Sequence, residues 1–323
     1  MAERPRVFML DTLHNEKSID LAIEAEILGE TAQLSLAQIA ERDNFPEEVF
    51  AADALILSPY PQLSAKILRS FRNLRVVVRN GVGYDNVDVK AARELGIPVC
   101  NVPDYGTEEV ADHALLLTLA LERNLYRALN AVRGGSWSWQ AAQPTRRLRG
   151  QRFGIVGCGR IGTAAALRAK AFGFAVQFFD PYVASGYEKA IGVERCATLA
   201  QLLQTSDVVS LHCPLTAETR GMVSLSRMQG MKTGAFLVNT ARGPLIPEAD
   251  LLEMLRSGHL GGVALDVIER EPEHSPELLT FSNCLLTPHT AFYSEESLTD
   301  LRAGAARVVV RFLRGEGLIN VVN

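Results

Sequence analysis

A glycine-rich segment in the middle of the chain has the pattern of a dinucleotide-binding turn. Gly157-Cys158-Gly159-Arg160-Ile161-Gly162 fits GxGxxG between a strand-like run and a helical pattern. In such a turn the first glycine permits a tight bend, the second lets backbone amides approach a pyrophosphate, and the third packs the helix closely against the strand. The N-terminus of that helix attracts the anion. An ordinary glycine-rich turn has the same letters, so the interpretation depends on the residues around the motif.

Asp180 supports the dinucleotide interpretation. It follows the next strand-like run, 23 positions after Gly157, where a carboxylate hydrogen-bonds the ribose hydroxyls of the ligand. The alternative is a carboxylate that caps its own loop before Pro181. A carboxylate here repels a 2′-phosphate, and Pro181-Tyr182 brings no arginine to offset it. We therefore predict NAD, rather than NADP, as the cofactor.

Three polar side chains follow later strand-like runs, where an open α/β sheet builds its ligand crevice. Arg242 offers a forked donor for a carboxylate and a polarised carbonyl. His289 suits proton exchange with an alkoxide near neutral pH, and Glu271 favours the charged form of a neighbouring histidine and orients its ring. Taken singly, each also fits a structural role, as a turn residue, a buried histidine or a surface charge. Their joint occurrence after a dinucleotide motif favours hydride transfer to a carbonyl compound.

The elements that must position these residues alternate along the chain. From about residue 150, strands are expected at 153–156, 176–179, 208–211, 235–238, 263–265 and 284–286, with helices at 161–172, 198–203 and 248–256. The first hundred residues have strand-like runs at 7–10, 54–57, 76–78 and 98–100, and long helices are expected at 108–131 and 297–314. Such alternation predicts right-handed crossovers and parallel sheets covered on both faces.

The position of the glycine motif determines the expected domain layout. A dinucleotide motif normally opens its domain at the first strand, and here it lies in mid-chain. We therefore predict an α/β protein with two Rossmann-like, doubly wound parallel-sheet domains. An NAD-binding domain covers residues 103–291. A flavodoxin-like substrate-binding domain, made of residues 1–102 and 292–323, is discontinuous and split around it.

Composition argues against several other classes of protein. The 323 residues carry 33 Lys+Arg against 37 Asp+Glu, a net charge of −4, so no nucleic-acid partner is expected. The longest apolar stretch, 114–121, is far below the ~20 residues of a membrane span. Five cysteines without a CxxC or Cys/His cluster indicate reduced thiols and no metal site. The first residues, 1–5, lack the apolar core of a signal peptide, which predicts a cytoplasmic protein.

Taken together, these motifs resemble those of the D-isomer-specific 2-hydroxyacid dehydrogenases over essentially the whole length of the chain. The resemblance lies in the glycine motif and in residues 79–86, 239–243, 266–272 and 288–289. The C-terminal-binding-protein branch is especially similar, in residues 166–174, 179–182, 292–295 and 322–323.

The resemblance implies a role for each matching position. Arg242 would bind and polarise a 2-oxoacid, His289 would be the acid/base, and Glu271 would orient His289. Cofactor contacts would come from Gly157, Gly159, Arg160, Ile161, Gly162, Asp180, Cys213, Pro214, Thr219, Asn239, Thr240, Ala241, Asp266 and His289. Substrate contacts would come from Arg79, Gly81, Val82, Gly83, Arg242 and Phe292. That branch often has tryptophan where this chain has Phe292, so its substrates could differ.

The predicted function is a reversible, NAD-dependent transfer of hydride between NADH and a small 2-oxoacid. The alternative is a dimeric NAD(H)-sensing protein of the corepressor type, because such proteins retain the same triad. The chain ends at Asn323 without the tail that corepressors carry, which favours the enzyme. Trp137 and Trp139, which follow the long helix expected at 108–131, suggest a homodimer formed through the NAD-binding domain; packing between domains would explain them equally. An L-type dehydrogenase is disfavoured, since its cofactor loop would lie near the N-terminus.

Overall fold

The computed structural model describes residues 3–12 and 20–323, so Met1 and Ala2 of the N-terminal segment interpreted above lie outside it. The chain forms two compact units. The smaller unit comprises Met1–Gly106 and Ser294–Asn323, and the larger unit comprises Thr107–Tyr293. These bounds differ by a few residues from the expected 102/103 and 291/292. The reason is local: Thr107 begins a helix of the larger unit, and Ser294 caps a helix of the smaller one.

The larger unit contains a seven-stranded sheet in the order β12-β11-β10-β9-β6-β7-β8, in which all neighbours are parallel. Its strands are β6 (Arg152–Val156), β7 (Ala175–Phe179), β8 (Glu194–Arg195), β9 (Val208–Leu211), β10 (Phe236–Asn239), β11 (Gly262–Leu265) and β12 (Cys284–Leu286). The strand order reverses between β6 and β9. At such a topological switch point a doubly wound sheet binds its ligand beyond the carboxyl ends of the strands.

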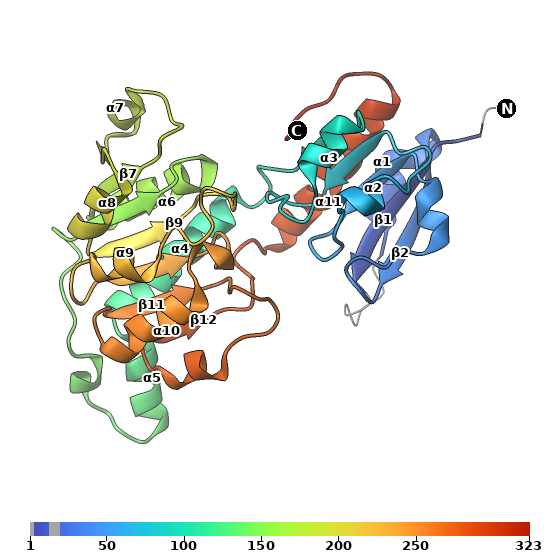
Figure 1. Ribbon diagram of the computed structural model, residues 1–323. Helices are drawn as coiled ribbons and strands as arrows, with labels where there is room; N and C mark the ends of the chain where they lie inside the picture. The colour runs from blue at the N-terminus through green and yellow to red at the C-terminus, as the bar shows by residue number, and fades with distance from the viewer. Residues whose placement is uncertain (1–2, 13–19) are drawn as a thin grey trace. The chain divides into compact units, whose positions relative to one another are not determined.

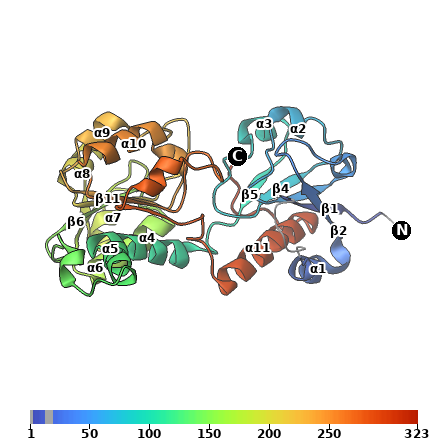
Figure 2. The same cartoon turned by 90° about the horizontal axis from the view of Figure 1, so that it is seen from below.

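Helices cover both faces of this sheet (Figure 2). One face carries α4 (Thr107–Glu122) and α6 (Arg160–Ala171), and the other carries α8 (Leu199–Thr205), α9 (Leu225–Gln229) and α10 (Glu248–Ser257). Helix α5 (Leu125–Arg133) follows α4 and contacts α4 and residues 139–142 rather than the sheet. Two separate apolar cores fill the layers between sheet and helices. Helix α6 packs closely because Ala165, Ala166 and Ala169 form its buried side. The Thr198 hydroxyl caps α8, and Gly258 ends α10 with a φ of 66°.

The prediction of one continuous helix over 108–131 is wrong. Helix α4 ends at Glu122 and α5 begins at Leu125, because Asn124 between them has a left-handed φ of 48°. Asparagine tolerates this conformation better than most residues. Its Nδ2 donates to the carbonyls of Ala142 and Pro144, which fixes the break against the following loop.

The smaller unit contains a five-stranded parallel sheet in the order β2-β1-β3-β4-β5, the flavodoxin-like order. Its strands are β1 (Arg6–Thr12), β2 (Gln33–Ile39), β3 (Ala54–Leu57), β4 (Val76–Arg79) and β5 (Val99–Asn101). Helices α2 (Ala65–Leu68) and α3 (Val89–Glu94) cover one face, and α1 (Ala22–Leu28) and α11 (Glu295–Leu313) cover the other (Figures 1 and 2). The buried carboxylate of Glu24 accepts two bonds from Arg302, at 2.7 and 2.6 Å, and ties α11 to α1. The predicted fold class is confirmed.

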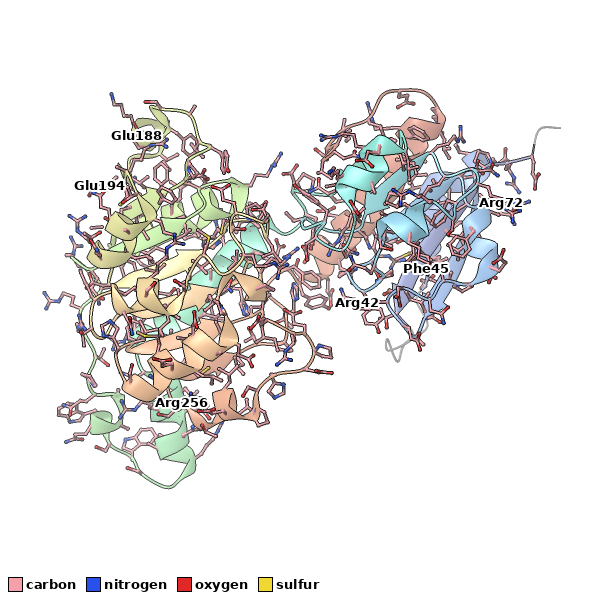
Figure 3. The ribbon with its side chains drawn as sticks, viewed as in Figure 1. Arg42, Phe45, Arg72, Glu188, Glu194 and Arg256 are labelled. Atoms are coloured by element: carbon pink, nitrogen blue, oxygen red, sulfur yellow. The ribbon has the colours of Figure 1, made fainter. Side chains whose placement is uncertain are left out.

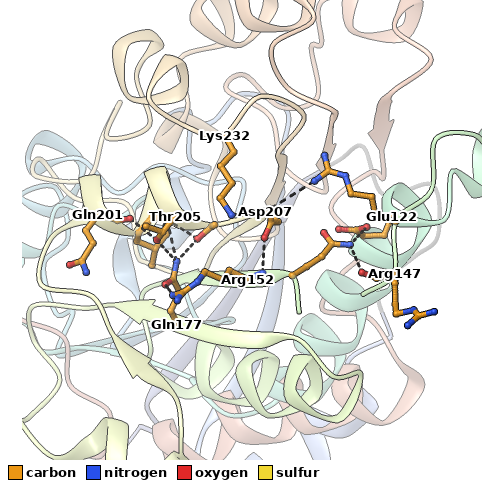
Figure 4. Close-up of polar contacts among 12 residues, drawn as sticks. Glu122, Arg147, Arg152, Gln177, Gln201, Thr205, Asp207 and Lys232 are labelled. Carbon is orange, nitrogen blue, oxygen red and sulfur yellow. Dashed lines mark hydrogen bonds and ion pairs between the residues drawn. The ribbon is translucent and has the colours of Figure 1, made fainter. Parts of the chain in front are cut away.

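A polar network lies at the amino ends of β6 and β9, the edge of the sheet away from the expected ligand site (Figure 4). The Asp207 carboxylate accepts the Arg152 amide at 2.8 Å and the Lys232 ammonium at 3.0 Å. Gln177 of β7 donates to the Thr205 and Ser206 hydroxyls at the end of α8. These bonds fasten strands and helices to one another, so the network has a structural explanation.

All five cysteines are buried free thiols, as their spacing predicts. Across residues 3–12 and 20–323, the structure contains no helix with the length and apolar character needed to span a membrane.

Candidate active site

The glycine motif forms the turn between β6 and α6, and its three glycines have different surroundings. Gly157 has a φ of 89°, and a Cβ there would lie 2.8 Å from the Cys213 amide nitrogen after β9. A Cβ on Gly162 would lie 2.0 Å from the Gly157 carbonyl oxygen. At Gly159, the N-cap of α6, a Cβ would meet no atom within 4 Å. The fold itself therefore requires the first and third glycines, while the second leaves open space in front of the helix N-terminus. That space fits a dinucleotide pyrophosphate.

Asp180 follows β7 and bonds to this turn. Its carboxylate accepts the Cys158 amide and the Tyr182 amide, both at 2.8 Å. The loop-capping role is thus present, and the same carboxylate lies beside the glycine turn, where the dinucleotide interpretation requires it.

Arg195 contacts the Asp180 loop, and its guanidinium is hydrogen-bonded within the protein. It donates to the backbone carbonyls of Asp180, Val183 and Ala184, and its Nε lies 3.0 Å from the Glu188 carboxylate. Figure 3 shows Glu188 on the short helix α7 (Tyr187–Ile191) beside this loop. The arginine also lies over the Phe178 ring. Its charge is therefore already satisfied in the fold.

The loop after β9 carries the predicted residues Cys213, Pro214 and Thr219. The Thr219 hydroxyl donates to the Pro214 carbonyl at 2.7 Å and closes the loop on itself. Burial raises the pKa of Cys213 to about 11, so this residue remains a neutral thiol. The Tyr182 hydroxyl donates to Glu218 and links this loop to the loop after β7; that bond raises the pKa of Tyr182. The two loops follow β7 and β9, the strands that flank β6.

The turn after β10 presents Arg242. Asn239 is fully buried, accepts the Ala241 amide at 3.0 Å and donates to the Arg242 carbonyl at 2.9 Å, which fixes the turn through Thr240. Next in the chain is Gly243, where a Cβ would lie 1.8 Å from the Ile268 carbonyl oxygen. Only glycine allows the Arg242 turn to lie this close to the segment that follows β11.

That segment carries Glu271, and the loop after β12 carries His289. The Glu271 carboxylate lies 2.7 Å from His289 Nδ1, and its other oxygen accepts the Ile268 amide at 3.2 Å. Both side chains are partly exposed, at 37% and 40%. Because Nδ1 faces the carboxylate, Nε2 is the nitrogen left for proton exchange with a ligand. The Phe292 ring meets the His289 ring edge to face, with centroids 6.2 Å apart.

Asp266, at the end of β11, is buried and holds the His289 loop. Its carboxylate accepts the amides of Thr290 and Ala291, both at 2.9 Å, and its carbonyl accepts the His289 amide. Thr287 donates its hydroxyl to the same carboxylate, and His113 of α4 lies next to Thr287. No local sequence pattern connects His113 with Thr287, which lie 174 positions apart, so the predicted site includes neither residue.

The smaller unit has its own group of predicted residues at the carboxyl end of β4. Arg79 is 7% exposed, and its Nη1 donates to the Asn80 carbonyl at 2.9 Å. A Cβ on Gly81 would lie 1.5 Å from that Nη1, so glycine is required for this path of the arginine side chain. Asn101 donates to the Val82 carbonyl at 2.7 Å and fixes the loop that leads to Gly83.

Known proteins resemble this chain throughout. Residues 115–291 match the model of the D-isomer specific 2-hydroxyacid dehydrogenase, NAD binding domain. C-terminal-binding protein 1 of Caenorhabditis elegans is 38% identical over 97% of this chain and 44% of its own length. D-3-phosphoglycerate dehydrogenase of Methanocaldococcus jannaschii is 34% identical over 98% of this chain and 59% of its own length. The chain thus spans about half the length of these curated relatives.

Solved structures share the whole fold. The structure of D-lactate dehydrogenase from Aquifex aeolicus with NAD and lactic acid has a TM-score of 0.86 and 30% sequence identity, with 95% of this chain and 96% of that chain covered. The match to the NAD-binding domain model covers more than half of the present sequence and includes the glycine turn, Asp180 and the Arg242, Glu271 and His289 segments. The chain belongs to the D-isomer specific 2-hydroxyacid dehydrogenase family.

Proposed function

We propose that this protein is an NAD-dependent dehydrogenase that interconverts a small 2-oxoacid and its D-2-hydroxyacid. The observation that carries the proposal is the 2.7 Å pair of His289 and Glu271, held beside the Arg242 turn by the close approach at Gly243. The larger unit would bind the cofactor, and the smaller unit would contribute substrate contacts. Bound NADH supplies the hydride.

The chain's own groups fit NAD. The open space at Gly159 and the N-terminus of α6, with Arg160 and Ile161, would receive the pyrophosphate, and Asp180 would accept a ribose hydroxyl. NAD is favoured over NADP because Asp180 would repel a 2′-phosphate, while the nearby Arg195 is engaged with Glu188 and backbone carbonyls. The loops from Cys213 to Thr219 and from Asn239 to Ala241, together with Asp266, would contact the rest of the cofactor.

His289 would act as the acid/base. As the carbonyl carbon accepts hydride, its oxygen gains negative charge, and the His289 Nε2 proton moves to it; the reverse reaction removes that proton. By pairing with Nδ1, Glu271 would hold the ring in the orientation that leaves Nε2 for the substrate. Arg242 would polarise the carbonyl and hold the substrate carboxylate with its forked donors.

In the smaller unit, the amides of Val82 and Gly83, with Gly81 and Arg79, would bind the substrate carboxylate, because convergent amides and a cation favour an anion. Phe292 lies against His289 and would limit the room for the substrate side chain.

A panel of 2-oxoacids assayed with NADH and NADPH tests the proposal. We expect NADH oxidation with at least one 2-oxoacid, formation of the D-product, and a preference for NADH. Failure of the whole panel would favour the alternative function, a dinucleotide-sensing binding protein of the corepressor type. The 38% identity to C-terminal-binding protein 1 supports that alternative.

We also propose a cytoplasmic homodimer formed through the larger unit. Helix α5 buries none of its residues and exposes Leu125, Tyr126, Leu129 and Val132. Trp137 and Trp139 follow, with exposures of 90% and 72%. Several large apolar side chains exposed within one short segment are typical of an interface. Light scattering at micromolar concentration should give the mass of a dimer; a monomer would contradict this part of the proposal. The proposed cytoplasmic location is supported by the five buried free thiols, because cysteines stay reduced in that compartment.

A further inference from the structure

A chain of hydrogen bonds connects helix α4 to the loop that carries His289. His113 Nε2 lies 3.0 Å from the Thr287 hydroxyl oxygen, and that hydroxyl donates to Asp266 Oδ1 at 2.6 Å. His113 Nε2 is also 3.6 Å from the same carboxylate oxygen. The side chain of Asp266 is fully buried and that of His113 is 16% exposed. These three side chains come from α4, the end of β11 and the end of β12.

The chemistry of the hydroxyl fixes the direction of this chain. A threonine hydroxyl has one proton, and the 2.6 Å bond to the carboxylate uses it. Toward His113, the Thr287 oxygen can therefore only accept. His113 Nε2 must carry the hydrogen, so the bonds run from His113 to Thr287 to Asp266.

Asp266 connects this chain of hydrogen bonds to the loop that carries His289. One carboxylate oxygen takes the Thr287 hydroxyl and the Thr290 amide, and the other takes the Ala291 amide at 2.9 Å. Its backbone carbonyl accepts the His289 amide at 2.9 Å. His289 itself has a φ of 53°, a left-handed conformation that a non-glycine residue adopts only when its surroundings hold it there. A rotation of the Asp266 side chain would release the backbone just after His289.

We propose that His113 is a positioning residue for the reaction: by donating through Thr287 it fixes the rotamer of Asp266, and Asp266 fixes the His289 loop. The inference rests on the proposed function, in which His289 exchanges the proton. His113 touches neither Glu271 nor His289 in the hydrogen bonds of the described residues, so its effect passes through Asp266.

Matched substitutions separate the donor from the bulk of the side chain. In His113→Gln the amide Nε2 can reach the place of the imidazole Nε2 and still donate, whereas His113→Leu fills the space without a donor. Thr287→Ser keeps the hydroxyl, and Thr287→Val removes it at nearly the same shape. We expect kcat to fall about 10- to 100-fold in His113→Leu and Thr287→Val, as for a catalytic group displaced by ~1 Å. KM for the 2-oxoacid should stay within about twofold, and His113→Gln and Thr287→Ser should retain most of kcat.

A second measurement does not depend on activity. Hydrogen–deuterium exchange of the peptide that contains Thr290 and Ala291 reports whether their amides remain bonded to Asp266. Exchange should be about tenfold faster in His113→Leu and Thr287→Val than in the wild type or the conservative variants. If no 2-oxoacid is reduced but exchange follows this pattern, the proposed function fails and the positioning network stands. The inference is overturned if His113→Leu leaves both kcat and exchange unchanged, or if His113→Gln is as impaired as His113→Leu at an unchanged Tm.

Discussion

Replacement of Gly159 by alanine adds one methyl group, which should weaken cofactor binding without destabilising the fold. The residue has a φ of −76° in extended backbone, and its added Cβ would meet nothing within 4 Å. Alanine at a glycine position with a compatible conformation stabilises a protein by about 0.4–1 kcal/mol, because the unfolded chain loses freedom. We therefore expect Gly159→Ala to fold with an equal or slightly higher Tm.

The same methyl group would occupy part of the open space at the N-cap of α6, where the pyrophosphate is expected. Loss of one hydrogen bond to a charged group costs about 1.5–3 kcal/mol, which raises the Kd for NADH about 10- to 100-fold. Gly157 and Gly162 offer no such separation, since a Cβ at either would lie within 3 Å of backbone atoms and disturb the fold.

The assay is calorimetric or fluorescence titration of NADH, together with thermal unfolding. Gly230→Ala is the matched control: Gly230 ends α9 with a φ of −77°, and a Cβ would come no closer than 3.3 Å to other atoms. Gly230→Ala should leave the Kd unchanged. A wild-type Kd in Gly159→Ala with an unchanged Tm would refute the assignment of this space to the pyrophosphate. A large fall in Tm would refute the reading of the space as open.

Three other predictions concern specificity and stability. Asp180→Ala should raise the ratio of kcat/KM for NADPH over NADH about tenfold, equivalent to ~1.4 kcal/mol, and a wild type that prefers NADPH would contradict the role of Asp180. Arg302→Met should lower the unfolding free energy measured in urea by about 3 kcal/mol, because Glu24 stays buried without its partner; a loss below 1 kcal/mol would contradict this. Burial lowers the pKa of His212 to about 4. As pH falls from 6.5 toward 4, the unfolded chain therefore binds a proton at this histidine before the folded protein does, and the free energy of unfolding decreases by at most about 3 kcal/mol. His212→Gln should flatten that part of the urea-measured stability profile relative to the wild type, and identical slopes would contradict the shift.

The sequence predicted those parts of the structure that depend on local pattern. Short apolar runs identified nearly all strands of the larger sheet, and the glycine motif with Asp180 located its switch point. Strand β2 was missed. Gln33–Ile39 lies at the edge of the sheet and is only partly buried, so polar residues interrupt its apolar ones and it lacks the continuous apolar run of the central strands. The break at Asn124 depends on carbonyls of a later loop, which no helical periodicity reveals.

In the candidate site, too, local pattern predicted the residue types but not the contacts between distant segments. The residue types of Arg242, Glu271 and His289 are the basis of the predicted hydride and proton transfer, which stays a prediction. Their positions in the sequence do not show how close they lie in the fold. Their juxtaposition depends on two backbones meeting at Gly243 and on Asp266, which binds the amides after His289. The role proposed for His113 could not be predicted, because it depends on the packing of α4 against β10 and β11, which brings His113 next to Thr287.

Comparison of His289→Gln with the wild type in a single turnover of NADH and a 2-oxoacid tests the central claim most directly. Removal of a general acid lowers the rate of proton-coupled transfer by about 10²- to 10⁴-fold. We predict a loss of this size in the rate of NADH oxidation with an unchanged Tm, because His289 is partly exposed and its ring hydrogen-bonds only to Glu271 among the described residues. Oxidation of NADH within threefold of the wild-type rate would contradict the proposed mechanism.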